Sequence, residues 1–185
     1  MIDRLIERIK NDKANWTKFQ HFFVEREIPS KYILLGEGEI ATNIFFVKRG
    51  CLRMWFNKDG KDITLQFFFE YQSVASIDSF DSRQPSLFTI ESIEPTTLIS
   101  ISKENFDLLL FTYPELKNMF QGIIFQRFRN YARLFLSRIK DTPQERYKDL
   151  IENYPEIIKR VQQHYIASYL GITPVSLSRI RNRRE

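Results

Sequence analysis

The stretch YIASYLGITPVSLSRIRNRR, residues 165–184, carries a clear local pattern of small and apolar side chains. They fall into two groups on either side of Gly171: Ile166, Ala167 and Leu170, then Ile172, Leu177 and Ile180. This spacing predicts a short helix, a tight glycine turn and a second helix packed across the first. Such a pair is typical of the helix-turn-helix with which proteins read DNA.

The second helix of this pair has a well-defined predicted start. Thr173 is a good N-cap residue, and Pro174 fits the first helical position. At about 100° per residue, Leu177 and Ile180 turn toward the first helix. The opposite face carries Val175, Ser178, Arg179 and Asn182, with Arg183 beside it.

That opposite face has the chemistry of base recognition. Arg179 can form a fork of hydrogen bonds to O6 and N7 of a guanine, Asn182 can pair with an adenine, and Val175 can touch a thymine methyl group. Side chains nearer the edge suit phosphates, and these are Ser176, Arg181 and Arg183. The residues expected to contact DNA are therefore Thr173, Val175, Ser176, Ser178, Arg179, Arg181, Asn182 and Arg183.

Positive charge gathers in the same part of the sequence. Residues 159–185 hold six basic residues and one acid, whereas residues 1–158 hold 22 of each, so the net charge of +5 falls on this segment. A basic segment on a neutral body is typical of contact with a phosphate backbone. Taken alone, a charge run this short would rather indicate a solvated helix end.

Composition excludes several other classes of protein. The 185 residues are 43% hydrophobic, enough for a packed core, and no apolar run approaches bilayer length. The opening residues MIDRLIERIKNDK carry charges throughout, which predicts a cytoplasmic protein without membrane attachment. Cys51 is the only cysteine, which excludes a disulfide framework and a cysteine-held iron–sulfur cluster. Since no metal cluster, nucleophile motif or P-loop appears, we expect neither an enzyme nor a cofactor.

Short β-type runs broken by turns fill the segment from Tyr32 to Ile101. They read KYILLG, NIFFVKRG, CLRMWFNKDG, DITLQFFFE, FTIESIE and TTLISI. The NKDG turn predicts a hairpin in which Asp59 and Gly60 supply the positive φ values. Antiparallel strands at this spacing predict a jelly-roll-like sandwich or barrel. Two short helices are expected before it, at about residues 2–9 and 15–23.

A long helix is predicted from about residue 115 to residue 139, spanning about 37 Å at 1.5 Å per residue. Its apolar residues form two rows: Leu116, Met119, Ile123 and Leu134, and then Ile124, Phe128, Tyr131, Phe135 and Ile139. Both rows could pack onto the β domain, or the second could pair with the same helix of another subunit. Because the helix outreaches a small sandwich, we favour the second arrangement and predict a dimer interface at Ile124, Phe128, Tyr131 and Phe135.

A new helix is predicted to begin after Asp141. Thr142, Pro143 and Glu145 stand at the N-cap, first and third helical positions of a capping box, and the helix should end at Tyr154 before Pro155. The expected fold is therefore α+β in three parts. These are a β jelly-roll sensor domain at 1–113, a dimerisation helix at 114–140 and an all-α helix-turn-helix domain at 141–185.

This order of elements resembles the Crp/Fnr family of bacterial transcription regulators, named for the cyclic-AMP receptor protein, over nearly the whole chain. NIFFVKRGCLRMWFNKDGKDITLQFF follows the family's β pattern, with Gly50 and Gly60 at hairpin positions. DTPQERYKDLIENYP followed by YIASYLGITPVSLSRIR looks most like the short members common in Bacteroidetes-type bacteria. The resemblance implies a homodimer whose partners are double-stranded DNA and RNA polymerase. Arg179 matches a base-reading arginine of the family, but Pro174 and Val175 replace the other two positions, so no target sequence is implied.

The resemblance also implies a cyclic-nucleotide pocket. The family carries a Gly-Glu pair that holds the ribose and, about ten residues on, an Arg-Ser or Arg-Thr pair that holds the cyclic phosphate. In SVASIDSFDSRQPSLFTIES, residues 73–92, these pairs fall on Ala75-Ser76 and Ser86-Leu87, so the phosphate has no cation. Arg83 lies nearby, in a turn. We expect a degenerate pocket at Ala75, Ser76, Ser86 and Leu87, no binding of cyclic AMP and an unknown effector.

Two readings of the function remain from the sequence. The first is a homodimeric, sequence-specific DNA-binding regulator of the Crp/Fnr type. The alternative is a ligand-sensing or protein-interaction module whose helix-turn-helix has become a scaffold. The concentration of basic charge at residues 159–185 favours the first.

Overall fold

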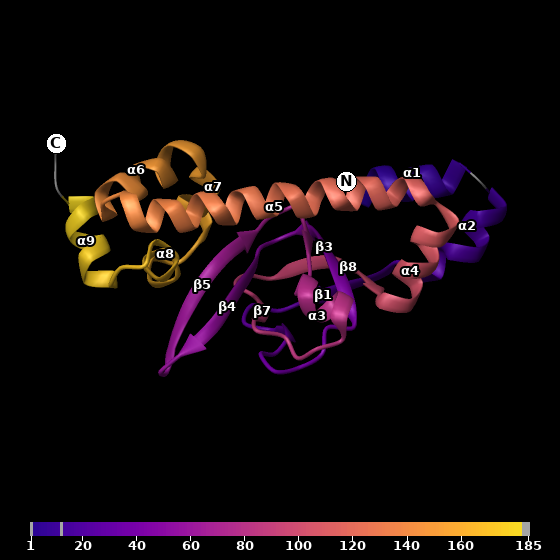
Figure 1. The fold of residues 1–185 in the computed structure, drawn as a ribbon, viewed down its shortest axis with the longest axis horizontal. Coiled ribbons are helices and arrows are strands. Elements are labelled where there is room, and N and C mark those ends of the chain that lie inside the picture. Colours follow the sequence, from indigo (N-terminus) through magenta and orange to yellow (C-terminus); the bar gives the residue numbers. More distant parts are fainter. Residues whose placement is uncertain (1, 12, 183–185) are drawn as a thin grey trace. The chain divides into compact units, whose positions relative to one another are not determined.

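The computed structural model describes residues 2–11 and 13–182 (Figure 1). The chain divides into two compact units, which we call the β-roll unit and the helical unit. The β-roll unit comprises residues 1–56 and 65–112, and the helical unit comprises residues 57–64 and 113–185. The tip of one β hairpin, residues 57–64, therefore belongs with the helices.

Two four-stranded sheets build the β-roll unit, with strand orders β1-β8-β3-β6 and β2-β7-β4-β5. Strand β8 pairs antiparallel with β1 and β3, and β7 pairs antiparallel with β2 and β4. The strands are β1 (Val24–Ile28), β2 (Ile33–Leu35), β3 (Asn43–Arg49), β4 (Leu52–Lys58), β5 (Lys61–Phe68), β6 (Ser73–Val74), β7 (Thr89–Ser92) and β8 (Thr96–Ser102). This arrangement confirms the predicted β jelly-roll.

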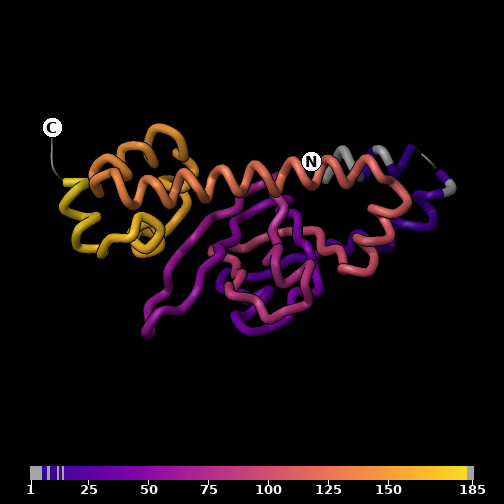
Figure 2. Tube along the Cα trace, in the orientation of Figure 1, coloured from indigo at the N-terminus to yellow at the C-terminus, as the bar shows by residue number. Residues whose placement is uncertain are grey.

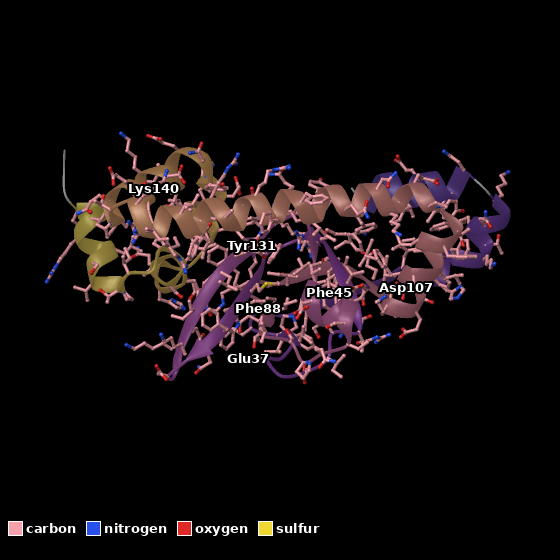
Figure 3. The ribbon with its side chains drawn as sticks, in the orientation of Figure 1. Glu37, Phe45, Phe88, Asp107, Tyr131 and Lys140 are labelled. Atoms are coloured by element: carbon pink, nitrogen blue, oxygen red, sulfur yellow. The ribbon has the colours of Figure 1, made fainter. Side chains whose placement is uncertain are left out.

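The core of this unit comes from the apolar runs of the sequence. In β3 four consecutive residues from Ile44 to Val47 are buried, so both faces of the strand are covered. Phe45 is one of them and is labelled in Figure 3. Leu52, Ile90 and Leu98 on β4, β7 and β8 are fully buried as well. Apolar burial of this extent is the main force that holds the two sheets together.

Glycine turns join the strands as the sequence predicts. Between β4 and β5, Asp59 and Gly60 have φ values of 52° and 79°, which confirms the predicted turn. The backbone trace in Figure 2 follows the chain through this hairpin. Gly50, between β3 and β4, has a φ of 102°, and a Cβ atom there would lie 2.8 Å from the carbonyl oxygen of Pro95. Any other residue at position 50 would therefore be strained and crowded.

Among its described residues the β-roll unit has five helical segments: α1 (Ile2–Asn11), α2 (Lys13–Phe19), the 3-10 helix η1 (Gln20–Phe22), α3 (Ile77–Ser82) and α4 (Lys103–Thr112). The helices expected at residues 2–9 and 15–23 are present as α1 and as α2 with η1. The strands β1 and β6 and the helices α3 and α4 were not predicted. In β1 only Ile28 is buried, so the strand lacks the apolar pattern that marks the others.

The helical unit contains α5 (Pro114–Lys140), α6 (Pro143–Asn153), α7 (Pro155–Arg160), α8 (Gln163–Leu170) and α9 (Pro174–Asn182). With 27 residues, α5 is about 40 Å long. The predicted capping box at the start of α6 is present: the Thr142 side chain accepts from Glu145 N at 3.3 Å, and the Glu145 carboxylate accepts from Thr142 N at 2.7 Å. Tyr154 and Pro155 end α6 as predicted, and the short α7 follows.

Candidate functional site

Helices α8 and α9 form a closely packed pair joined by a three-residue turn. Gly171 ends α8 with a left-handed φ of 70°, and the amide of Ile172 donates to the carbonyl of Ala167 at 2.9 Å. The Thr173 hydroxyl accepts from the amide of Ser176 at 3.1 Å, so Thr173 is the N-cap of α9 as predicted. The apolar residues of the opening stretch lie inside the pair: Tyr165, Ile166, Ala167, Leu170 and Leu177 are buried. The predicted helix, glycine turn and second helix are all present.

The outward face of α9 carries the side chains expected to read bases. Val175, Ser178, Arg179 and Asn182 are exposed, as is Arg181. Ser176 is half-buried, and its hydroxyl lies 2.9 Å from that of Thr173, within the cap. Arg183 lies outside the described residues.

A small cavity lies between the helices of this region. Its volume is about 180 Å³, and its lining includes Tyr147, Ile166, Leu177 and Arg181. Leu177 and Ile166 form its apolar side, while the exposed Arg181 borders it. The arginine is therefore placed between the core of the helix pair and the outer surface.

Two serines lie close together at the position where the resemblance to the Crp/Fnr family implies a cyclic-nucleotide pocket. Ser76 and Ser86 are both buried, and their Oγ atoms are hydrogen-bonded to each other at 2.9 Å. The Ser86 hydroxyl also contacts the carbonyl of Phe88 at 2.7 Å. Ala75 is buried beside Ser76, whereas Leu87 is 64% exposed. The structure thus brings three of the four predicted residues together.

Arg83 is held at the surface, away from these serines. It ends α3 with a left-handed φ of 61°, and its Nη2 lies 2.6 Å from Glu104 Oε1. The Arg83 side chain lowers the pKa of the Glu104 carboxyl by hydrogen bonding and charge. Since this guanidinium is engaged with Glu104, it does not supply the missing cation to Ser76 and Ser86.

A buried ion pair joins the neighbouring strands β4 and β7 of the second sheet. It was not predicted from the sequence. Arg53 on β4 lies opposite Glu91 on β7, with Arg53 Nη2 3.0 Å from Glu91 Oε1. The indole nitrogen of Trp55 donates to the other carboxylate oxygen at 3.1 Å, and the Arg53 guanidinium lies 4.9 Å from the centre of the Trp55 ring. Both oxygens of Glu91 have partners, which is the condition under which a buried pair is tolerated. Charged residues inside the apolar runs LRMWF and TIES were the only signal in the sequence.

The apolar residues of α5 separate into buried and exposed sets. Leu116 and Phe120 are buried, and Met119, Ile123 and Leu134 are half-buried. The exposed set consists of Ile124, Phe125, Phe128, Phe135, Leu136 and Ile139. We call this set the exposed α5 row. Within this row, Phe128 is 68% exposed to solvent.

Tyr131 differs from the other residues of the predicted dimer interface. It is half-buried on α5 (Figure 3), and burial raises the pKa of its hydroxyl, opposed in part by the nearby Arg127. Phe125, which was not among the predicted interface residues, is exposed. Residues 125, 128, 132, 135 and 139 then follow the alternating spacing of three and four that is typical of a coiled-coil interface.

The described part of the chain shows neither a metal-binding cluster nor a membrane-spanning helix. Among residues 2–11 and 13–182, no three His, Cys, Asp or Glu side chains gather as ligands of a metal ion would. Nor does any helix in the described part combine the length and apolar character needed to cross a bilayer.

Several known proteins are similar to this chain in sequence or in fold. Residues 25–113 match the family described as the cyclic nucleotide-binding domain. The chain is 22% identical over 161 residues to the transcriptional activator protein FnrA of Stutzerimonas stutzeri; the match spans 81% of this chain but only 66% of FnrA. Its fold is similar to that of FixK2 from Bradyrhizobium japonicum, with a TM-score of 0.75, 17% identity, and coverage of 87% of this chain and 83% of that one. It is also similar to CLP of Xanthomonas campestris, a c-di-GMP-responsive global regulator, with a TM-score of 0.74, 15% identity, and coverage of 89% and 87%.

A β-roll of the cyclic nucleotide-binding type, a long helix and a closing pair of helices make up the fold that this chain shares with FixK2 and CLP. The sequence match covers the β-roll unit from residue 25 onward, and the structural matches extend over the helices. Residues 25–113 thus match the cyclic nucleotide-binding domain family, and the whole architecture is similar to the folds of FixK2 and CLP.

Proposed function

We propose that this chain is a homodimeric, sequence-specific DNA-binding transcription regulator that reads the major groove with α9. The observation that carries the proposal is the outward face of α9. There Arg179 and Asn182, both able to form paired hydrogen bonds to base edges, lie exposed beside Val175. Arg181 stands next to them and suits a phosphate.

The charge distribution supports the same function. The net charge of +5 lies within residues 159–185, the part of the chain that contains α8 and α9. Phosphate contacts supply much of the affinity for DNA, so a reader needs its positive charge at the contact face. A helix pair kept only as a scaffold has no need for this placement.

A dimer would make the recognition specific. The exposed α5 row gives a second copy of α5 an apolar surface to cover, and paired α5 helices would relate the two α9 helices by a two-fold axis. Two reading helices about one DNA turn apart, roughly 34 Å, would select a near-palindromic site. The regulator would act in the cytoplasm and through RNA polymerase.

The pocket of the β-roll suits a different effector from cyclic AMP, or none. A cyclic nucleotide brings a phosphate monoanion that needs a cationic partner when buried. Ser76 and Ser86 bond to each other at that place, and Arg83 is engaged with Glu104. We therefore propose that cyclic AMP and cyclic GMP are not ligands.

Capture of the protein on chromatin, followed by sequencing of the bound DNA, tests the proposed function. The expected result is a limited set of enriched sites that share a near-palindromic motif. An Arg179→Ala variant expressed at the same level should lose these sites. Enrichment that is uniform along the genome, or the same with both proteins, would favour the protein-interaction module instead.

A further inference from the structure

The helix α8 is fastened to the β4–β5 hairpin by one serine. The Ser168 hydroxyl donates to the carbonyl of Asp62 at 2.6 Å and accepts from the amide of Thr64 at 2.8 Å. Because β5 is the edge strand of its sheet, these are groups that a further strand would otherwise pair. Thr64 is fully buried, so its amide is bonded to Ser168 rather than to water.

Arg138, near the end of α5, reaches the same junction. Its Nη2 donates to the carbonyl of Tyr169 at 2.9 Å and lies 3.5 Å from the carbonyl of Thr64. Burial lowers the pKa of this guanidinium, yet an arginine stays charged at any physiological pH. A cation at the carboxyl end of a helix is favourable, since it faces the unpaired carbonyls of the last turn.

A third segment completes the junction from α6. Arg146 Nε donates to the carbonyl of Leu170 at 3.2 Å, and its Nη1 donates to the carbonyl of Asp141 at 2.5 Å. The last three residues of α8 are thus each tied to a different segment: the hairpin, the end of α5 and the start of α6. Gly171 follows directly, and α9 begins three residues later. The orientation of α9 is therefore set at this junction.

We propose that Ser168 and Arg138 are positioning residues for DNA reading, which fasten α8 to the β4–β5 hairpin so that α9 is held in one orientation. For its effect on DNA the proposal rests on the proposed function. Neither residue touches a base in this scheme.

Removing one hydroxyl tests the fastening. Ser168→Ala deletes both hydrogen bonds to β5, while Ser168→Thr keeps a hydroxyl that can form them. In Ser168→Ala, amide hydrogen exchange at Thr64 should accelerate about tenfold, the size expected for one lost hydrogen bond. Affinity for a specific duplex should fall by a similar factor because binding must now order α8 as well. The salt dependence should not change, since no phosphate contact is lost.

A matched control and a rescue make the result decisive. Ser82→Ala removes a helix serine whose hydroxyl bonds to the carbonyl of Asp78 and the amide of Gln84, both in the β-roll unit, and should change neither exchange at Thr64 nor DNA affinity. Ser168→Thr should restore both. If Ser168→Ala does not fold, Arg138→Lys takes its place, because a lysine keeps the charge but cannot reach both carbonyls.

Two results would overturn the proposal. One is unchanged exchange at Thr64 in Ser168→Ala, which would mean that α8 is not fastened there. The other is faster exchange with undiminished DNA affinity, which would make the contact structural only. A wild-type chain that binds no duplex specifically would instead overturn the proposed function, and the exchange measurement would still decide whether hairpin and helix are fastened together.

Discussion

Replacement of Phe128 on α5 tests the proposed dimer. In the single chain Phe128 is 68% exposed, which corresponds to about 135 Å² if a phenylalanine presents about 200 Å². At about 25 cal/mol per Å², covering that area would contribute about 3 kcal/mol per subunit and about 6 kcal/mol per dimer, as an upper limit. Since about 1.4 kcal/mol is a factor of ten, Phe128→Ala should weaken dimerisation by up to about 10⁴-fold. Phe128→Arg should weaken it further, because each subunit would bury an unpaired charge.

Sedimentation equilibrium from nanomolar to micromolar concentration measures this effect. The wild-type chain should sediment at twice its mass of 22.2 kDa, and Phe128→Arg at the mass of one chain. Arg133→Ala is the matched control, because Arg133 is exposed on the same helix but lies outside the exposed α5 row. Equal masses for wild type and Phe128→Arg at micromolar concentration would show that the exposed α5 row has no role in dimerisation.

Three further experiments test the ligand pocket, the DNA contacts of α9 and the burial of Tyr169. Calorimetric titration with cyclic AMP or cyclic GMP should show no binding tighter than millimolar, because Ser76 and Ser86 bond to each other; a micromolar constant would disprove this. Arg179→Ala should cost about 1–3 kcal/mol on the specific duplex and relax one base position, whereas Arg181→Ala should weaken all duplexes alike and lower the salt slope by about one. Equal losses on specific and random DNA for both variants would make Arg179 a phosphate contact only. Burial raises the pKa of Tyr169 to about 12, so its neutral hydroxyl favours the folded state below pH 10, and stability should fall by about 2–3 kcal/mol as the pH rises from about 10 to about 12. Tyr169→Phe should remove that fall in denaturant titrations across this range, and identical curves for the two proteins would contradict it.

Local signals explain why much of the fold was predictable. The Asp59–Gly60 turn, the capping box at Thr142 and the N-cap at Thr173 each depend on a few consecutive residues, and all three are present. The strand β1 was missed because its residues VEREI are mostly charged and exposed. An edge strand with one buried residue has no alternating pattern to detect.

Contacts between distant residues explain most of what was not predicted. The bonds of Ser168 to β5 join residues more than 100 positions apart, and the pair of Arg53 and Glu91 depends on the register of β4 with β7. No local pattern encodes either of them. On α5 the row was assigned from spacing alone, which placed Tyr131 where the structure exposes Phe125. Leu87 was aligned with the pocket, yet its side chain is exposed to solvent.

Selection of bound duplexes from a random DNA library measures directly whether α9 reads DNA sequence. The expected result is a motif of two inverted half-sites about one helical turn apart, with one base position that loses its preference when Arg179 is replaced by alanine. Recovery of sequences without any shared motif, at an affinity that depends only on salt, would contradict the claim that α9 reads DNA sequence.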